Sequence, residues 1–268
     1  TPMIINIAGI DVHVEGEADA EPIVMVHGWP DTYRLWDAQV ESLRAKYRCI
    51  RFTLPGFDAT QPRRLYTVDE VTGFIRQVVL QLSPQKKVTL LLHDWGCMYG
   101  YEFTMRNPTL VARIVGVDIG DAHTLLRALS TRDKVYVVAY QMWLALAWKL
   151  RGRLGEWMTL KMARLLGSRL DPRLIRSQMN YPYYLAVFGG QQSFSRQTQP
   201  FKPACPMLYV YGQRKLVMFQ ATAWTDWLAT QPGSRVVAFD TGHWVTLQQP
   251  ERFNQVMGEW LAATSASA

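Results

Sequence analysis

The residue best suited to covalent chemistry is Asp94, in the stretch LLHDWG that ends a hydrophobic run. A carboxylate at a sharp turn between a buried strand and a helix is lifted clear of the sheet, where it can attack carbon and form an ester. Gly96 supplies the small residue that such a turn requires after the nucleophile. An aspartate in this place can also simply cap the following helix, so two interpretations stay open.

The motif HGWP, at residues 27–30, also follows a hydrophobic run. Because Gly28 permits a close turn, the backbone N–H of Trp29 can join that of Trp95 in holding a carboxylate or an oxyanion. We therefore expect both tryptophans at a substrate-binding site. His27 and His93 are expected to hydrogen-bond neighbouring loops, not to act as bases.

The stretch DTGHW, at residues 240–244, supplies an imidazole after the last expected strand. His243 would lie beside Asp94 and could activate water against an ester. An acid is needed to orient this imidazole, and the stretch RIVGVDIGD offers two. Asp118 ends an expected strand and Asp121 follows three residues later; we prefer Asp118 but either could serve.

A parallel sheet would bring these motifs together, because ligands bind at the carboxyl ends of parallel strands. Residues 3–17 read as an antiparallel hairpin, and strands then alternate with helices. Strands are expected at 21–28, 47–56, 87–96 and 111–120, and helices at 32–47, 67–82 and 96–108. Thr67 and Glu70 form a Thr-x-x-Glu capping box that predicts the start of the second helix.

The alternation stops between residues 122 and 200, where aromatic-rich helical segments are expected at 135–148, 155–167 and 172–190. Strands return at 205–212 and 234–243, followed by a helix at 250–263. We predict an α/β fold with a mostly parallel, doubly wound sheet. Its core domain would comprise residues 1–121 and 201–268, with an inserted helical cap domain at 122–200.

The composition is that of a soluble globular enzyme, with 49% hydrophobic and 19% charged residues among 268. Scattered Lys and Arg account for the net charge of +7, which indicates a solvated or membrane-touching face and no nucleic-acid groove. The three cysteines have neither disulfide nor zinc spacing, and no metal or organic cofactor is expected. No signal peptide opens the sequence, and no apolar run reaches the ~18 residues of a spanning helix. A cytoplasmic protein without stable membrane insertion is expected.

The motifs HGWP, HDWG and GHW, in this order and split by a helical segment, resemble the α/β-hydrolase superfamily. Within it they are similar to the epoxide hydrolase and haloalkane dehalogenase branch, whose nucleophile is Asp. The resemblance covers essentially the whole chain. It implies that an Asp94 ester is hydrolysed by water that His243 activates. Dehalogenases usually carry Asn where this chain has Trp29, so the resemblance to epoxide hydrolases is preferred.

The same resemblance implies that cap tyrosines donate a proton to the epoxide oxygen. We expect Tyr140 to pair with Tyr184 or Tyr183, although each could be an ordinary core aromatic of the cap. Trp143 and other cap aromatics indicate a small apolar substrate.

One departure from the family concerns the third residue after the strand MLYVYG. Many relatives carry the acid there, whereas this chain has Lys215, which would repel an imidazolium. The acid is therefore expected at Asp118. A haloalkane dehalogenase, or a non-catalytic protein that binds an apolar ligand, are the alternatives.

Overall fold

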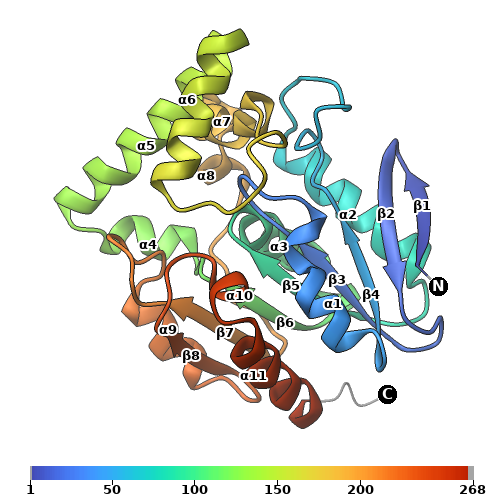
Figure 1. Cartoon of the computed structure of the whole chain (residues 1–268). Coiled ribbons are helices and arrows are strands. Elements are labelled where there is room, and N and C mark those ends of the chain that lie inside the picture. Colours follow the sequence, from blue (N-terminus) through green and yellow to red (C-terminus); the bar gives the residue numbers. More distant parts are fainter. Residues whose placement is uncertain (1, 265–268) are drawn as a thin grey trace.

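The computed structural model describes residues 2–264 and contains one eight-stranded sheet in the order β1-β2-β4-β3-β5-β6-β7-β8 (Figure 1). The strands are β1 (Met3–Ile7), β2 (Ile10–Glu15), β3 (Glu21–Val26), β4 (Tyr47–Phe52), β5 (Val88–His93), β6 (Val111–Val117), β7 (Met207–Gly212) and β8 (Arg235–Phe239). The helices are α1 (Asp37–Leu43), α2 (Val68–Leu82), α3 (Trp95–Arg106), α4 (Ala122–Ala128), α5 (Thr131–Leu150), α6 (Gly152–Leu165), α7 (Tyr181–Phe188), α8 (Phe194–Gln197), α9 (Thr222–Ala229), α10 (Val245–Gln248) and α11 (Pro250–Ala263).

The sheet is antiparallel only at its first edge, where β1 pairs with β2 and β2 with β4. All other neighbours run parallel, as the alternation of strands and helices predicts. The six residues of β5 are all buried because the sheet is covered on both faces. Leu90 and Leu92 pack into one apolar cluster and Leu91 into the other, following the two-residue period of a strand.

The two faces of the sheet are covered by different helices. Residues of α1 and α11 pack into one cluster, while residues of α2 and α3 pack into the other. The capping box of α2 is present as predicted: Thr67 accepts from the Glu70 N–H, and Glu70 accepts from the Thr67 N–H. The helix expected at 32–47 instead starts as a 3₁₀ turn at Tyr33–Trp36, which Thr32 caps, and continues as α1.

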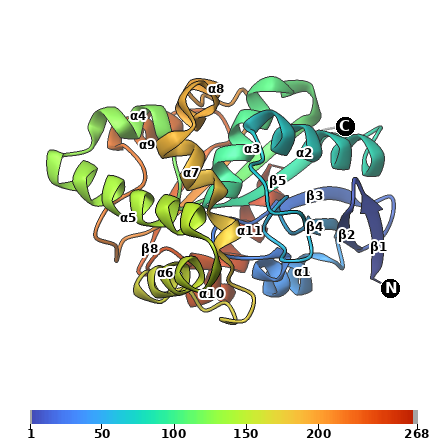
Figure 2. The same cartoon turned by 90° about the horizontal axis from the view of Figure 1, so that it is seen from above.

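Between β6 and β7 the regular elements are all helices, α4 to α8, joined by turns and short 3₁₀ segments. We refer to residues 122–200 as the cap. Figures 1 and 2 show these helices grouped on the side of the molecule away from β1 and β2. The third helix is shorter than expected, because residues 172–180 form turns and a 3₁₀ segment before α7 begins at Tyr181. Among the described residues, no helix is long and apolar enough to cross a membrane.

The parallel register brings the carboxyl ends of several strands to one level. Val26 lies beside Leu92, His93 beside Val117, and Val117 beside Val210. The loops after β3, β5, β6 and β7 therefore start at the same edge of the sheet. This alignment brings together motifs that are far apart in the sequence.

The turn after β5 depends on glycine at position 96. A Cβ atom on Gly96 would lie 2.0 Å from the carbonyl oxygen of Val26, so α3 can approach β3 only without a side chain there. We expect Gly96→Ala to lower the free energy of unfolding by about 2 kcal/mol or more, as overpacking does. Chemical denaturation monitored by circular dichroism measures this change.

Gly73→Ala is the matched control, because Gly73 lies in the interior of α2 and an added Cβ would meet nothing within 4 Å. Because alanine has a higher helix propensity than glycine, this substitution should raise the free energy of unfolding by roughly 0.5–1 kcal/mol. Equal stability of the two variants would contradict the close approach described for Gly96.

Candidate active site

Asp94 occupies the turn between β5 and α3 with a left-handed backbone, at φ 54° and ψ −124°. Although it stands at the N-cap position of α3, its side chain caps no helical N–H. Instead, Oδ1 accepts a hydrogen bond of 2.7 Å from the backbone N–H of Trp29, and Oδ2 lies 3.2 Å from Nε2 of His243. The strained turn thus aims the carboxylate at the imidazole and away from the helix.

The imidazole of His243 bridges two carboxylates. Its Nδ1 is hydrogen-bonded to Oδ2 of Asp118 at 2.5 Å, while Nε2 faces Asp94. Asp121, the other acid considered from the sequence, accepts from the backbone N–H groups of Thr124 and Phe201 and caps α4. Asp118 is therefore the carboxylate that orients His243, and Asp121 holds the start of the cap.

Lys215 contacts the same acid from its other side. Its Nζ lies 2.5 Å from Oδ1 of Asp118, which also accepts a 2.9 Å hydrogen bond from the N–H of Gly212. The expected repulsion between Lys215 and an imidazolium is offset because Asp118 stands between the two cations. The four side chains form a row in which basic and acidic groups alternate: Lys215, Asp118, His243 and Asp94.

These contacts shift the titration of the whole row. Burial alone would raise the pKa of both aspartates, but His243 lowers the pKa of Asp94, and Lys215 with His243 lowers the pKa of Asp118. Burial alone would lower the pKa of His243, but its bonds to Asp118 and Asp94 raise it to about 9. At neutral pH the resting site therefore holds two carboxylates and an imidazolium.

The other two histidines of the motifs have structural contacts. Nε2 of His27 accepts from the Leu54 N–H, and Nδ1 bonds to the Gly28 carbonyl. Nε2 of His93 is hydrogen-bonded to the carbonyl of His243 at 3.1 Å. Burial lowers the pKa of each to about 4, so both are neutral imidazoles that support loops.

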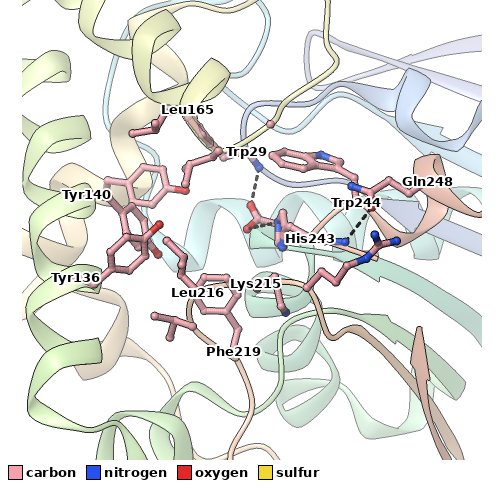
Figure 3. Close-up of a pocket in the computed structure, with 17 residues that line it drawn as sticks. Trp29, Tyr136, Tyr140, Leu165, Lys215, Leu216, Phe219, His243, Trp244 and Gln248 are labelled. Carbon is pink, nitrogen blue, oxygen red and sulfur yellow. Dashed lines mark hydrogen bonds and ion pairs between the residues drawn. The ribbon is translucent and has the colours of Figure 1, made fainter. Parts of the chain in front are cut away.

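A cavity of about 490 Å³ opens above Asp94. Figure 3 shows His243 and Trp244 on one side of this cavity and Tyr136 and Tyr140 on the other. A second cavity, of about 220 Å³, also borders Asp94 and is lined mostly by apolar cap and core residues. Both cavities share four lining residues: Asp94, Tyr140, Tyr183 and Phe219.

Three tyrosines of the cap line the cavities: Tyr140 and Tyr183 line both, and Tyr136 lines only the larger one. Of the two partners expected for Tyr140, Tyr183 borders the cavities and Tyr184 does not. Tyr183 packs edge-on against the rings of Trp29 and Trp95 and lines both cavities together with Tyr140. Tyr184 lies against Trp148, at a ring distance of 4.6 Å, and borders neither cavity. Successive residues of a helix point about 100° apart, so only one of the two can face the site.

Trp143 is also placed away from the expected substrate site. Its indole N–H donates to the carbonyl of Met158 at 2.9 Å, and its ring packs beside Trp157. Trp29 lines the larger cavity and Trp95 the smaller one. Trp143 therefore joins α5 to α6 inside the cap, whereas Trp29 and Trp95 border the two cavities.

The indole of Trp29 connects the site to the cap. Its Nε1–H donates to Oδ1 of Asn180 at 2.8 Å, and Nδ2 of Asn180 donates to Oγ1 of Thr159 at 2.8 Å. Thr159 in turn donates to the carbonyl of Gly155 in α6. Trp29 therefore positions the Asp94 carboxylate with its backbone and holds the cap with its side chain.

Two further residues near His243 belong to none of the predicted motifs. Asp31 is buried and accepts a 2.9 Å hydrogen bond from the Trp244 indole; burial raises its pKa to about 7. Its position directly after HGWP is a sequence signal that could have identified it. Phe219 packs edge-on against His243, at a ring distance of 6.0 Å, from a loop that carries no recognisable motif.

Comparison with known proteins identifies the family of the fold. A profile of the alpha/beta hydrolase fold matches residues 21–250. Epoxide hydrolase 3 of Mus musculus is 23% identical over 277 residues, covering 95% of this chain and 74% of that protein. Epoxide hydrolase 1 of Caenorhabditis elegans is 27% identical over 138 residues, covering 48% of this chain and 34% of that protein.

Among solved structures, an epoxide hydrolase of Bacillus megaterium in complex with an inhibitor matches with a TM-score of 0.73 at 18% identity. The match covers 97% of this chain and 100% of that chain, and it shows a shared fold. The chain spans 17–34% of the length of the first curated relatives that it matches.

Within residues 2–264, no group of three or more His, Cys, Asp or Glu side chains could hold a metal ion.

The bridging position of His243 makes its pKa depend on Asp94. In Asp94→Asn the imidazolium loses one of its two carboxylate partners, so we expect its pKa to fall below about 9. An NMR titration of the ¹³C-labelled histidine ring measures this shift. Asp240→Asn is the control, because Asp240 is exposed and pairs with Arg214, not with His243. An unchanged His243 pKa in Asp94→Asn would contradict the arrangement.

The raised pKa of His243 also affects stability. Because it lies above the ordinary value of 6.5, the ion pairs of His243 stabilise the fold fully below pH 6.5. This contribution is lost as the pH rises through about 9, and it should be smaller in Asp94→Asn.

Proposed function

Because the chain belongs to the α/β-hydrolase-fold family, we propose that it is an epoxide hydrolase that opens apolar epoxides through an ester on Asp94. The observation that carries this proposal is the position of the Asp94 carboxylate between His243 and a cavity that two phenols, the half-buried Tyr140 and the buried Tyr183, also line. The relatives named as epoxide hydrolases support it.

In the first step Oδ2 of Asp94 attacks an epoxide carbon, and the carbon–oxygen bond of the ring breaks. The departing oxygen takes a proton from Tyr140 or Tyr183. Burial raises the pKa of both phenols, so they are neutral hydrogen-bond donors at physiological pH. Oδ1 keeps its hydrogen bond to the Trp29 N–H and becomes the carbonyl oxygen of the ester.

In the second step water attacks the ester carbonyl carbon. Formation of the ester removes the charge of Asp94, one of the two groups that raise the pKa of His243. The imidazolium can then pass its proton to the phenolate that the first step left and act as a base toward water, while Asp118 keeps its orientation. The negative charge that develops on Oδ1 is stabilised by the Trp29 N–H and by the Trp95 N–H at the start of α3. The bond between the carbonyl carbon and Oδ2 then breaks, and the leaving alkoxide takes the second proton of the attacking water. The diol departs with Oδ2, and the Asp94 carboxylate and the His243 imidazolium are restored.

The two cavities that border Asp94 suggest the shape of the substrate. Each borders the nucleophile and the phenols, and the smaller one is lined largely by aliphatic and aromatic side chains. An epoxide with an apolar substituent on each carbon could extend one arm into each cavity. We therefore propose internal epoxides as the preferred class.

The alternatives receive less support. In a dehalogenase two donors grip the leaving halide, but the Trp29 indole is bonded to Asn180 and so is not free for this role. The hypothesis of a non-catalytic protein depended on Lys215. Its ion pair with Asp118 lowers the pKa of that acid and keeps it ionised beside His243, which suits a working base.

Isotope incorporation tests the proposed ester. With enzyme in excess over an internal epoxide in ¹⁸O-water, the oxygen added to the first diol should come from Asp94 and be unlabelled by mass spectrometry. Later turnovers should carry label. Label from solvent in the first turnover would exclude the ester. A bromoalkane and an ester run in parallel should release neither bromide nor acid.

The phenols can be tested against a matched neighbour. We expect Tyr183→Phe to lower kcat by about 10²-fold, because general-acid assistance contributes roughly 10²–10⁴-fold. Tyr184→Phe, the same change one residue away, should leave kcat within about twofold, since Tyr184 borders neither cavity. Equal losses in both variants would contradict the assignment of the donors.

A further inference from the structure

The positive charge of the protein is concentrated in the cap. Residues 122–200 contain twelve Lys and Arg but three Asp and Glu, a net charge of +9. The rest of the chain contains seventeen basic and nineteen acidic residues, a net charge of −2. The total of +7 therefore belongs to one part of the molecule, and the remainder is slightly acidic.

Exposed apolar side chains gather in the same part. Of the fourteen large hydrophobic residues exposed within residues 2–264, ten belong to the cap and seven to α5 and α6. Trp157, on α6, is 54% exposed. Such a concentration is unusual for a surface that contacts only water, and it indicates an interaction site.

Helical spacing places these residues in continuous stripes. Val138 and Leu146 lie two turns apart on α5, and Arg153, Trp157, Lys161 and Arg164 follow at intervals of four, four and three residues on α6. We call these six residues the α5–α6 face. Trp143 and Trp157 pack together, at a ring distance of 6.1 Å, and join the two helices.

The α5–α6 face points away from the rest of the protein. Both helices contact the 3₁₀ turn at Ser177–Asn180, and α5 also packs against α7, so their exposed sides lie on the outside of the cap (Figure 1). The end of α6, next to Arg164 of this face, borders the larger cavity. Leu165, the last residue of α6, is 76% exposed and lines that cavity, as does Leu216, which is 79% exposed.

We propose that the α5–α6 face binds the surface of an anionic lipid bilayer. Trp157 and the exposed aliphatic residues would enter the interface, while Arg153, Lys161 and Arg164 contact acidic headgroups. The cavity would then open beside the bilayer, where apolar molecules concentrate. A nucleic acid would not account for the exposed aliphatic chains, and a second copy would bring two caps of like charge together.

Vesicle co-sedimentation tests this proposal independently of enzyme activity. The protein should bind phosphatidylcholine vesicles that contain about 30% phosphatidylglycerol and should bind pure phosphatidylcholine far more weakly. Raising the salt to 1 M, where the screening length falls to about 3 Å, should release most of it.

The combined variant Arg153→Gln, Lys161→Gln, Arg164→Gln should bind anionic vesicles about a hundredfold more weakly, at about fivefold for each lost charge. The control variant Lys46→Gln, Lys87→Gln, Arg235→Gln removes three exposed charges from the rest of the protein and should bind as the unmodified protein does. Trp157→Ala should weaken binding with little effect on salt dependence. Circular dichroism would verify that each variant is folded.

Three results would overturn the proposal. They are no binding to anionic vesicles, equal loss in the two triple variants, or a dimer in solution that Trp157→Ala dissociates. The first result would leave the epoxide hydrolase proposal untouched, because that proposal depends on Asp94 and not on the cap surface.

Discussion

A row of four largely buried ionisable groups holds together the edge of the sheet that carries the candidate site. Asp118 is completely buried, and the side chains of Lys215, His243 and Asp94 are at most 14% exposed. Burying a single charge costs several kcal/mol, and that cost is offset only where an opposite charge is in contact. Here each inner member has a partner on both sides. Removing an inner member leaves an outer charge without its partner in the row, and removing an outer member leaves its neighbour with one partner instead of two, so the positions of all four depend on one another.

The parallel sheet positions the members of this row within contact distance of one another. Asp94 and Asp118 both follow strands directly, and both have a positive φ that aspartate rarely adopts, 54° and 70°. Such conformations persist only where surrounding contacts compensate for them. The Trp29 N–H and His243 hold Asp94, and Gly212, Lys215 and His243 hold Asp118. All these contacts can form together because the carboxyl ends of the parallel strands lie at the same level.

The sequence predicts the parts of this protein that follow from local pattern. Uniformly apolar runs indicate strands covered on both faces, and Asp94 and His243 stand out because each ends such a run or follows one closely. Tyr183 and Tyr184 could not be distinguished in the same way. The start of α7 is set by a preceding 3₁₀ turn, and one residue of helical phase decides which phenol faces the cavity. The pairing of Lys215 with Asp118 depends on β6 and β7 being neighbours, which no local pattern records.

The hydrogen bonds that run from Trp29 through Asn180 to Thr159 restrict how the protein can open. Lifting the cap as a rigid lid would pull on the same tryptophan whose backbone holds the Asp94 carboxylate. A hinge at this point would therefore disturb the hydrogen bond that holds the Asp94 carboxylate whenever the cap moved. A route that leaves these bonds intact passes the exposed side chains that line the larger cavity, Leu165 and Leu216, whose movement disturbs neither Trp29 nor Asp94.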